Sequence, residues 1–163
     1  MDVDDGRLSQ IEQIYRTRLP ELWRVAAAIS GSREAAPDLV QDAFVRAVRR
    51  VDSFREDGPL EGWLWRIVVN VARNGRRGRL TLALTEELPA TSPPAEVADR
   101  DLAEALSHLP ERQRLVLFLR YYADLDYRTI GEALAISDGA VGATLTTARQ
   151  ALAQALEAKE ATP

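Results

Sequence analysis

Cysteine is absent from the 163 residues, and histidine occurs once, as His108. Without cysteine the chain has neither disulfides nor thiolate metal ligands, which suits a reducing cytoplasm. One imidazole is too few for a histidine metal cluster, and its position just before Leu109-Pro110 is typical of a helix end. No glycine-rich phosphate loop and no carboxylate pair placed with a base occurs either. We therefore expect no metal site, no cofactor and no enzymatic activity.

Long apolar runs are also missing, so no membrane insertion is expected, and the first residues, MDVDDG, are acidic where a signal peptide is basic. These features predict a cytoplasmic protein. The net charge of -4 argues against indiscriminate binding of nucleic acid. Residues 1–79, however, contain 14 arginines against 12 acidic residues, whereas residues 80–163 contain 7 basic residues against 13 acidic ones. A basic patch is therefore expected in the first half of the chain.

One stretch, GWLWRIVVNVARNGRRGR at residues 62–79, contains neither proline nor acidic residues. At the helical period its apolar residues share one face, formed by Leu64, Ile67, Val68, Val71 and Ala72. The opposite face consists of Trp63, Arg66, Asn70, Arg73, Asn74 and Arg77.

The chemistry of this second face is that of nucleic-acid recognition. Arginine pairs with phosphates, asparagine reads base edges, and tryptophan stacks on an unpaired base, so single-stranded nucleic acid is the expected ligand. The alternative is an amphipathic helix whose polar side is merely solvated. The two tryptophans, Trp63 and Trp65, beside five arginines favour the first interpretation.

Two further helices are expected before this stretch. The first covers residues 8–29, with Pro20 bending or dividing it, and the second covers residues 38–51, with an apolar stripe that includes Val48. The second helix begins with the polar residues Asp38, Gln41 and Asp42. Acidic side chains in the first turn also interact favourably with the positive end of the helix dipole, which alone would explain their presence.

The remainder of the chain predicts a linker and a second helical domain. Pro89, Pro93 and Pro94 indicate a linker over residues 80–100, which separates domains at 8–79 and 101–157. Residues 127–156 have the spacing of a helix-turn-helix, with Ser137 capping its second helix and small Gly131 at a close approach. The fold class expected is therefore all-α.

These segments together resemble a bacterial RNA polymerase sigma factor of the extracytoplasmic-function class. The resemblance rests on DLVQDAF at 38–44, the pattern from Phe54 to Arg73 with GWLWRI and the asparagine that follows, LPERQRLVLFLRY at 109–121, and the helix-turn-helix ending in Ala148-Arg149. These pieces occur in the family's order, with the linker in the expected place, and the resemblance covers residues 10–156.

The resemblance implies a region 2-like bundle and a region 4-like helix-turn-helix domain, joined by a flexible linker. It implies a factor that binds core RNA polymerase, recognises and melts promoter DNA, acts as a monomer and has an anti-sigma factor as a partner. The residues that match the polymerase-docking surface are Asp38, Leu39, Gln41 and Asp42. Those that match the minus-ten surface are Arg55, Trp63, Arg66, Asn70, Arg73, Asn74 and Arg77, and the loop at 55–60 matches one that holds a flipped base. Those assigned to the minus-thirty-five element are Arg128, Ser137, Gly142, Ala143, Thr144, Thr146, Thr147 and Arg149.

The last helix departs from the family pattern, because GAVGATLTTAR stands where a basic run is common. Arg149 is its only nearby cation, so binding to DNA by the free protein should be feeble. Polymerase would hold this helix near its site on DNA, so that even these few contacts would be enough for binding. Ala135 occupies the turn where glycine is usual, which costs on the order of 1 kcal/mol if that residue is left-handed.

Two alternatives stay open. A sigma-like protein that titrates an anti-sigma factor or polymerase without productive promoter recognition would explain the depleted last helix. An ordinary helix-turn-helix repressor would leave the first domain unexplained and predicts a dimer on palindromic sites.

Overall fold

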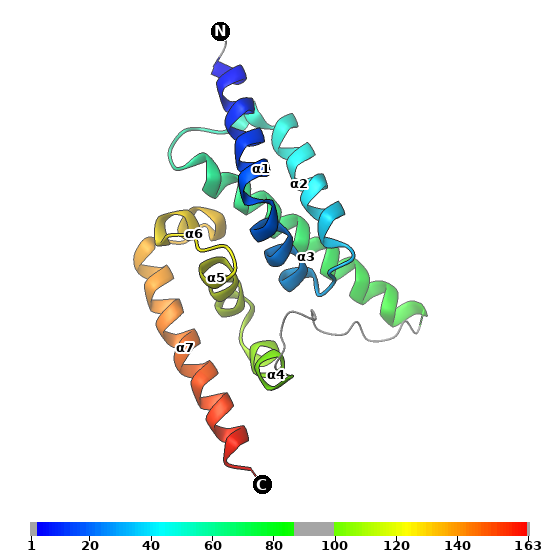
Figure 1. The fold of residues 1–163 in the computed structure, drawn as a ribbon, viewed down its shortest axis with the longest axis vertical. Coiled ribbons are helices and arrows are strands. Elements are labelled where there is room, and N and C mark those ends of the chain that lie inside the picture. The colour runs from blue at the N-terminus through cyan, green and yellow to red at the C-terminus, as the bar shows by residue number, and fades with distance from the viewer. Residues whose placement is uncertain (1–2, 87–99, 163) are drawn as a thin grey trace.

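The computed structural model describes residues 3–86 and 100–162, which form seven α-helices, one short 3-10 helix and no strand (Figure 1). The predicted all-α class is confirmed. The elements are α1 (Val3–Ser30), α2 (Ala36–Arg49), η1 (Val51–Ser53), α3 (Leu60–Glu86), α4 (Arg100–His108), α5 (Glu111–Tyr121), α6 (Tyr127–Leu134) and α7 (Asp138–Glu160).

Helices α1, α2 and α3 pack against one another as the first helical group. The apolar face predicted for α3 is directed inward, and Leu64, Val68 and Ala72 are at most 2 % exposed. Tyr15 and Phe44 meet edge to face between α1 and α2, with ring centroids 4.9 Å apart. Burial of each such Leu, Val or Phe side chain stabilises the fold by about 1.5–3 kcal/mol, so this group has a substantial core of its own.

The structure differs from the expectations for this part of the chain in three places. Helix α3 continues to Glu86, so the first seven residues of the expected linker are helical, because the first proline comes only at Pro89. Residues 87–99 of that linker lie outside the described residues, and its last residue, Arg100, begins α4. Val48, expected in the buried stripe of α2, is 48 % exposed, because it shares the outward side of α2 with Val45. Pro20 does not divide α1, which continues to Ser30.

Helices α4 to α7 form the second group, and α6 and α7 make the predicted helix-turn-helix. The side chain of Asp126 caps α6 by accepting from the Thr129 amide at 2.8 Å, and Ser137 caps α7 by accepting from the Ala140 amide at 3.1 Å. Ala135, between them, is left-handed, with φ 56° and ψ 46°. A Cβ on Gly131 would lie 2.7 Å from the Ile136 carbonyl oxygen, so the close approach there is to the turn.

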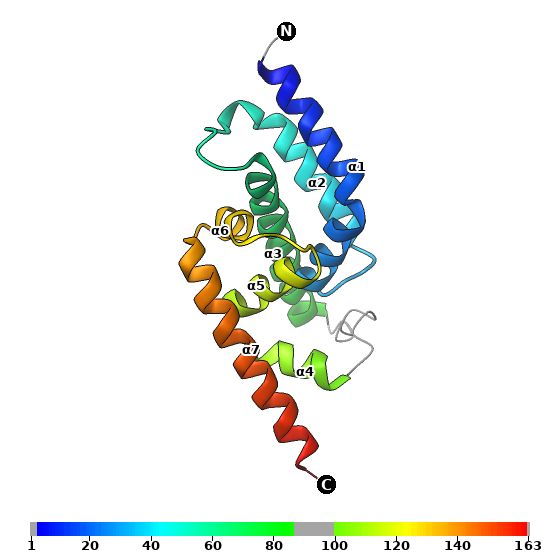
Figure 2. The ribbon, with the colours of Figure 1, turned by 60° about the vertical axis from the view of Figure 1, so that its left-hand side comes forward.

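The two groups pack against each other. Helix α6 contacts α3, beside which it lies in Figure 2, and α5 contacts α1. Buried apolar residues of both groups form one continuous cluster. Helix α3 contacts α1 and α2 of the first group and α6 of the second. The α3 face that sequence analysis assigns to nucleic acid therefore lies beside the second group.

Candidate nucleic-acid interface

Trp63 lies at the edge of the core rather than fully in solvent. Its ring is tilted against Phe54 with the centroids 5.6 Å apart, and the Arg7 guanidinium lies 5.7 Å from the centroid of the Phe54 ring. Trp63 is half-buried, whereas Arg55 in the adjoining loop is exposed. An indole held in this way by a neighbouring ring is oriented in advance, which favours stacking on an unpaired base.

The second tryptophan of α3 has a structural role. Trp65 is fully buried at 0 % exposure, and its indole nitrogen donates to Glu61 Oε1 at 3.4 Å. The same oxygen accepts from Arg18 Nε at 2.9 Å. Trp65 therefore belongs to the core and, contrary to the prediction from sequence, gives no support to the nucleic-acid interpretation.

The remaining members of the predicted α3 face fall into two classes. Asn70 and Asn74 are exposed, with their amides on the solvent side of α3. Arg66 and Arg73 are partly buried, because the second helical group contacts both: Arg66 Nε donates to the Glu132 carbonyl oxygen at 2.9 Å, and Arg73 makes a bidentate ion pair with Glu111. The side chain of Arg77 lies outside the described part of the chain. The predicted face is thus only half accessible, which periodicity within one helix could not reveal.

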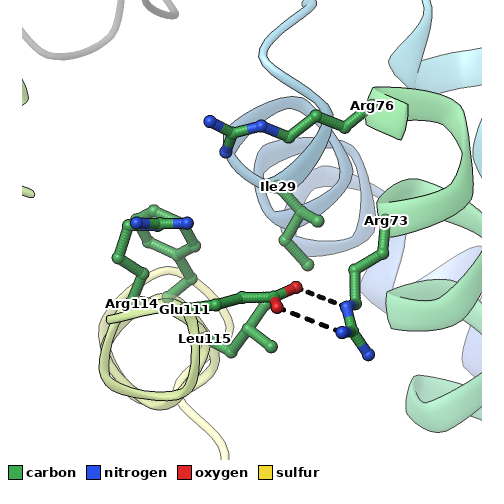
Figure 3. A pocket seen from close by; sticks show the side chains of 7 residues that line it. Ile29, Arg73, Arg76, Glu111, Arg114 and Leu115 are labelled. Carbon is green, nitrogen blue, oxygen red and sulfur yellow. Dashed lines mark hydrogen bonds and ion pairs between the residues drawn. The ribbon is translucent and has the colours of Figure 1, made fainter. Parts of the chain in front are cut away.

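Near Arg73, a half-open cleft of about 210 Å³ lies between the two groups and is lined by three arginines, Arg73, Arg76 and Arg114 (Figure 3). Arg73 and Arg76 come from α3, whereas Glu111 and Arg114 come from α5. Burial, and then the neighbouring Arg76, lower the pKa of the Arg114 guanidinium. Arg114 donates to the carbonyl oxygens of Leu109, at 2.5 Å, and Ser107. With three cations and one carboxylate, the cleft remains basic.

The outward side of α2 combines acidic and apolar side chains. Asp38, Gln41 and Asp42 are exposed, and Leu39 is partly buried against the core. Asp42 pairs with Arg46 at 3.1 Å, an exposed contact of small energetic value. Val45 and Val48 extend the same side and are 42 % and 48 % exposed. Sequence analysis did not predict that these valines are exposed. Asp42, Val45 and Val48 follow one another at intervals of three residues, which could have indicated that they share one side of the helix.

The outward face of α7 carries small side chains. Ala143, Thr146 and Thr147 are exposed, Gly142 and Thr144 are half-buried, and the hydroxyls of Thr146 and Thr147 donate to Gly142 and Ala143 carbonyl oxygens at 3.0 Å. Ser137, also assigned to this surface, is exposed and uses its hydroxyl as the helix cap, while Arg128 on α6 is exposed.

Two exposed tyrosines adjoin this helix-turn-helix surface and were missed by sequence analysis. Arg149 Nε donates to the Tyr121 hydroxyl at 2.5 Å, and its guanidinium lies 5.4 Å from the Tyr121 ring centroid. Tyr127 packs beside Gly142, where a Cβ would lie 3.4 Å from its ring. Tyr121 and Tyr127 are 57 % and 41 % exposed. Arg149, the cation predicted for the DNA-facing side of α7, is therefore already engaged by the aromatic ring of Tyr121.

Within the described ranges, no helix combines the length and the apolar character that crossing a bilayer requires. Among the same residues, no group of three or more His, Asp or Glu side chains is arranged to hold a metal ion. The polar side chains gathered on α2, α3 and α7 are instead suited to macromolecular contacts. Together with the helix-turn-helix of α6 and α7, this arrangement is typical of proteins that bind DNA.

Comparisons with known proteins identify the class more closely. Residues 14–80 match the family model Sigma-70 region 2, and residues 99–152 match Sigma-70, region 4. The chain therefore belongs to the sigma-70 family of RNA polymerase sigma factors, in the extracytoplasmic-function (ECF) class. Proteins of this family direct core RNA polymerase to promoter DNA in transcription initiation.

Individual relatives agree with this assignment. The chain is 31% identical over 160 residues to an RNA polymerase sigma-E factor of Streptomyces avermitilis, and the match covers 95% of this chain and 89% of that protein. It is 32% identical over 161 residues to the ECF RNA polymerase sigma factor SigE of Mycolicibacterium smegmatis, covering 91% of this chain but only 62% of that longer protein.

Solved structures with the same fold include two proteins at 25% identity and a TM-score of 0.69. One is CnrH in complex with the cytosolic domain of CnrY, where the match covers 96% of this chain and 99% of that chain. The other is the sigma factor RpoE in complex with the anti-sigma factor NepR from Bartonella quintana, where it covers 91% and 97%.

Proposed function

We propose that the protein divides the task of a sigma factor among three of its helices. The outward side of α2 docks on core RNA polymerase through Asp38, Leu39, Gln41 and Asp42. The α3 face captures the separated non-template strand of the minus-ten element, with Trp63 stacking and the two asparagines reading base edges. Helix α7 approaches the minus-thirty-five element. The main support is the exposed amide pair Asn70 and Asn74 beside a half-buried indole, in a chain of this family.

The same proposal assigns a role to each part of the chain. Residues 8–79 dock on polymerase and melt the minus-ten element, and residues 101–157 bind the minus-thirty-five element. Residues 80–100 connect the two parts and run through the polymerase toward the RNA exit path. The protein contributes no catalytic group, because polymerisation belongs to its partner. We infer that it acts as a monomer in the cytoplasm, where polymerase and promoter DNA are found.

An anti-sigma factor completes the set of partners that we propose. Its support is the structural similarity to RpoE, which was solved with the anti-sigma factor NepR. A second candidate function, titration of such a partner without promoter recognition, is favoured by one observation. The Arg149 guanidinium of α7 is engaged by Tyr121 and is flanked by small neutral side chains, so contacts to DNA phosphates are few.

The deciding experiment is run-off transcription with purified core polymerase and a promoter library. Asn70→Ala should reduce promoter-specific transcripts about tenfold or more, because amide contacts to a base edge are worth about 1–3 kcal/mol. Gln10→Ala, which removes an exposed amide from α1, is the matched control and should leave the transcripts unchanged.

Other results would favour the alternatives. Tight polymerase binding without a transcript from any promoter would favour titration. Specific binding of a palindromic duplex by a dimer of the protein alone would favour a repressor.

A further inference from the structure

The loop at 55–60 contains one residue in an unfavourable backbone conformation. Glu56 has φ 59°, in the left-handed region, which glycine and asparagine adopt readily and glutamate seldom does. A conformation of this kind persists only where the surrounding structure holds it, and it is most often found at ligand-binding sites. A contact from outside the loop is therefore needed to keep Glu56 in place.

Arg7 of α1 makes that contact. Its Nη2 donates to Glu56 Oε1 at 2.6 Å, and the pair joins segments that are 49 residues apart. The Arg7 side chain is only 18 % exposed, so its end of the pair is better shielded from water than a typical surface ion pair. Hydrogen bonds between a guanidinium and a carboxylate are among the stronger ones in proteins. Arg7 thus ties the loop to the first helix.

The same guanidinium lies against the aromatic pair beside the loop. Its carbon is 5.7 Å from the centroid of the Phe54 ring, and that centroid is 5.6 Å from the centroid of Trp63. Arg7 Nε is buried and has no hydrogen-bond partner among the described residues, which costs stability. The stability of the fold alone therefore does not explain why an arginine occupies this position.

These contacts meet where the proposed function places base capture. Phe54 precedes the loop, Glu56 lies within it, and Trp63 is the residue that would stack on a base. Arg7 contacts Phe54 and Glu56 directly and supports Trp63 through the Phe54 ring. A surface that is ordered before its ligand arrives does not lose that conformational freedom on binding, so it binds more tightly.

We propose that Arg7 is a positioning residue for base capture. Its guanidinium, held between the Glu56 carboxylate and the Phe54 ring, fixes the loop at 55–60 and the orientation of Trp63, and it does not itself contact DNA. This inference rests on the function proposed above. Arg7 precedes residues 14–80, which match the region 2 model, so membership of the family assigns it no role.

Two variants test the proposal from opposite ends of the ion pair. Arg7→Met keeps an apolar side chain of similar length and removes the guanidinium, whereas Glu56→Gln removes only the charge of its acceptor. The matched controls come from a second ion pair within α1, in which Arg16 and Glu12 are 2.7 Å apart and both exposed. Arg16→Met and Glu12→Gln make the same changes in net charge away from the loop.

The probe is a promoter selected in the run-off experiment, prepared with the non-template strand of its minus-ten element unpaired. It is used intact and with an abasic nucleotide at each position of the element in turn. Fluorescence anisotropy measures its binding to core polymerase that carries the full-length protein. In the wild type, the abasic nucleotide should weaken binding most at the position of the captured base.

The comparison between these two probes separates positioning from a general loss of structure. Arg7→Met should weaken binding of the intact probe about five- to tenfold, because the loop and Trp63 must then be ordered on binding. It should leave the affinity for the weakest abasic probe close to that of the wild type, since no base remains to be held. Glu56→Gln should act in the same direction, and both controls should match the wild type.

Two further measurements address how Arg7 acts. A direct contact to a phosphate would make the salt dependence of Arg7→Met shallower by about one unit, whereas a positioning residue leaves the slope unchanged. Hydrogen exchange of the free protein reports on the loop itself. The amides of residues 54–60 should exchange faster in Arg7→Met than in Arg16→Met, with the remainder of the chain unchanged.

Several outcomes would overturn the inference. An equal loss of affinity for the intact and abasic probes would show a general structural effect, and a shallower salt dependence would show that Arg7 binds DNA directly. Unchanged affinity or unchanged amide exchange in Arg7→Met and Glu56→Gln would show that the pair does not order the loop.

Failure of the proposed function gives a different result. The wild type would then produce no promoter-specific transcript, or no abasic position would weaken its binding. The role of Arg7 in base capture would fall with it, whereas amide exchange would still report whether Arg7 holds the loop.

Discussion

At the scale of single residues, the threonines on the outward face of α7 carry no charge with which to contact DNA phosphates. The Thr147 hydroxyl donates to the Ala143 carbonyl oxygen of its own helix, and its side chain is exposed. We predict that Thr147→Arg strengthens binding of the free protein to duplex DNA. It should also steepen the dependence of log affinity on log salt by about one unit, as expected for one added phosphate contact. Fluorescence anisotropy over a salt series measures both quantities.

Thr17→Arg provides the control for this change. Thr17 is exposed on α1 and donates in the same way to the Gln13 carbonyl oxygen, so it adds the same charge at a similar backbone site. An equal steepening in both variants would mean that the effect comes from net charge and not from the position of residue 147.

The exposed valines of α2 give a second prediction at this scale. Val48 is 48 % exposed on the side that carries Asp38 and Asp42, so a charge there should leave the fold intact. Val48→Asp should weaken binding to core polymerase about tenfold, because it adds a charge that must be desolvated to the apolar part of the proposed docking surface. Biolayer interferometry with immobilised polymerase measures this affinity. Ala153→Asp, on the exposed side of α7, should have no effect.

How far the sequence predicted the site can be judged from α3. Its period placed Leu64 and Val68 in the core and the asparagines in solvent, because those positions depend only on the geometry of one helix. It could not assign Trp65 to the core, since an indole on a boundary position is compatible with either environment. Nor could it predict that Arg66 meets Glu132, because that contact joins segments 66 residues apart and depends on how two helical groups pack.

At the scale of elements, the turn between α6 and α7 is strained at one position. Ala135 is left-handed with φ 56°, a conformation that glycine adopts without a steric penalty. Ala135→Gly should therefore raise the free energy of unfolding by roughly 0.5–1 kcal/mol, after allowance for the greater entropy of glycine in the unfolded chain. Urea unfolding followed by circular dichroism measures the change. Ala161→Gly, at the right-handed cap of α7 with φ -79°, should not stabilise.

The start of α6 predicts a dependence on pH. Hydrogen bonds from Thr129 lower the pKa of the Asp126 carboxyl below its ordinary value. Because the folded pKa is lower than the unfolded one, the stabilisation is complete above the unfolded value of about 3.9 and is lost as pH falls through the folded value. Asp126→Asn caps the helix without this titration, so the stability of the wild type should fall relative to the variant in acid.

Thermal unfolding at a series of acidic pH values tests this prediction. Asp52→Asn is the control, because Asp52 is an exposed aspartate of η1 that caps no helix through its side chain. Parallel curves for the wild type and Asp126→Asn would show that the carboxyl contributes nothing through its charge.

At the scale of the whole molecule, the two helical groups share one buried cluster, and α3 is packed on both sides. A shared core couples the groups, so the wild type should unfold in one transition with calorimetric and van't Hoff enthalpies that agree. A Cβ on Gly62 of α3 would lie 2.5 Å from Glu132 Cβ on α6, so Gly62→Ala should loosen the packing of the groups without removing apolar surface from either. The calorimetric enthalpy should then exceed the van't Hoff value. Gly6→Ala should keep the ratio of the wild type.

Differential scanning calorimetry of these three proteins measures the ratio directly. Two transitions in the wild type would mean that each group is stable alone and that the packing of α6 on α3 adds little free energy. One transition in the wild type and two in Gly62→Ala would mean that the close packing of Glu132 against Gly62 couples the two groups.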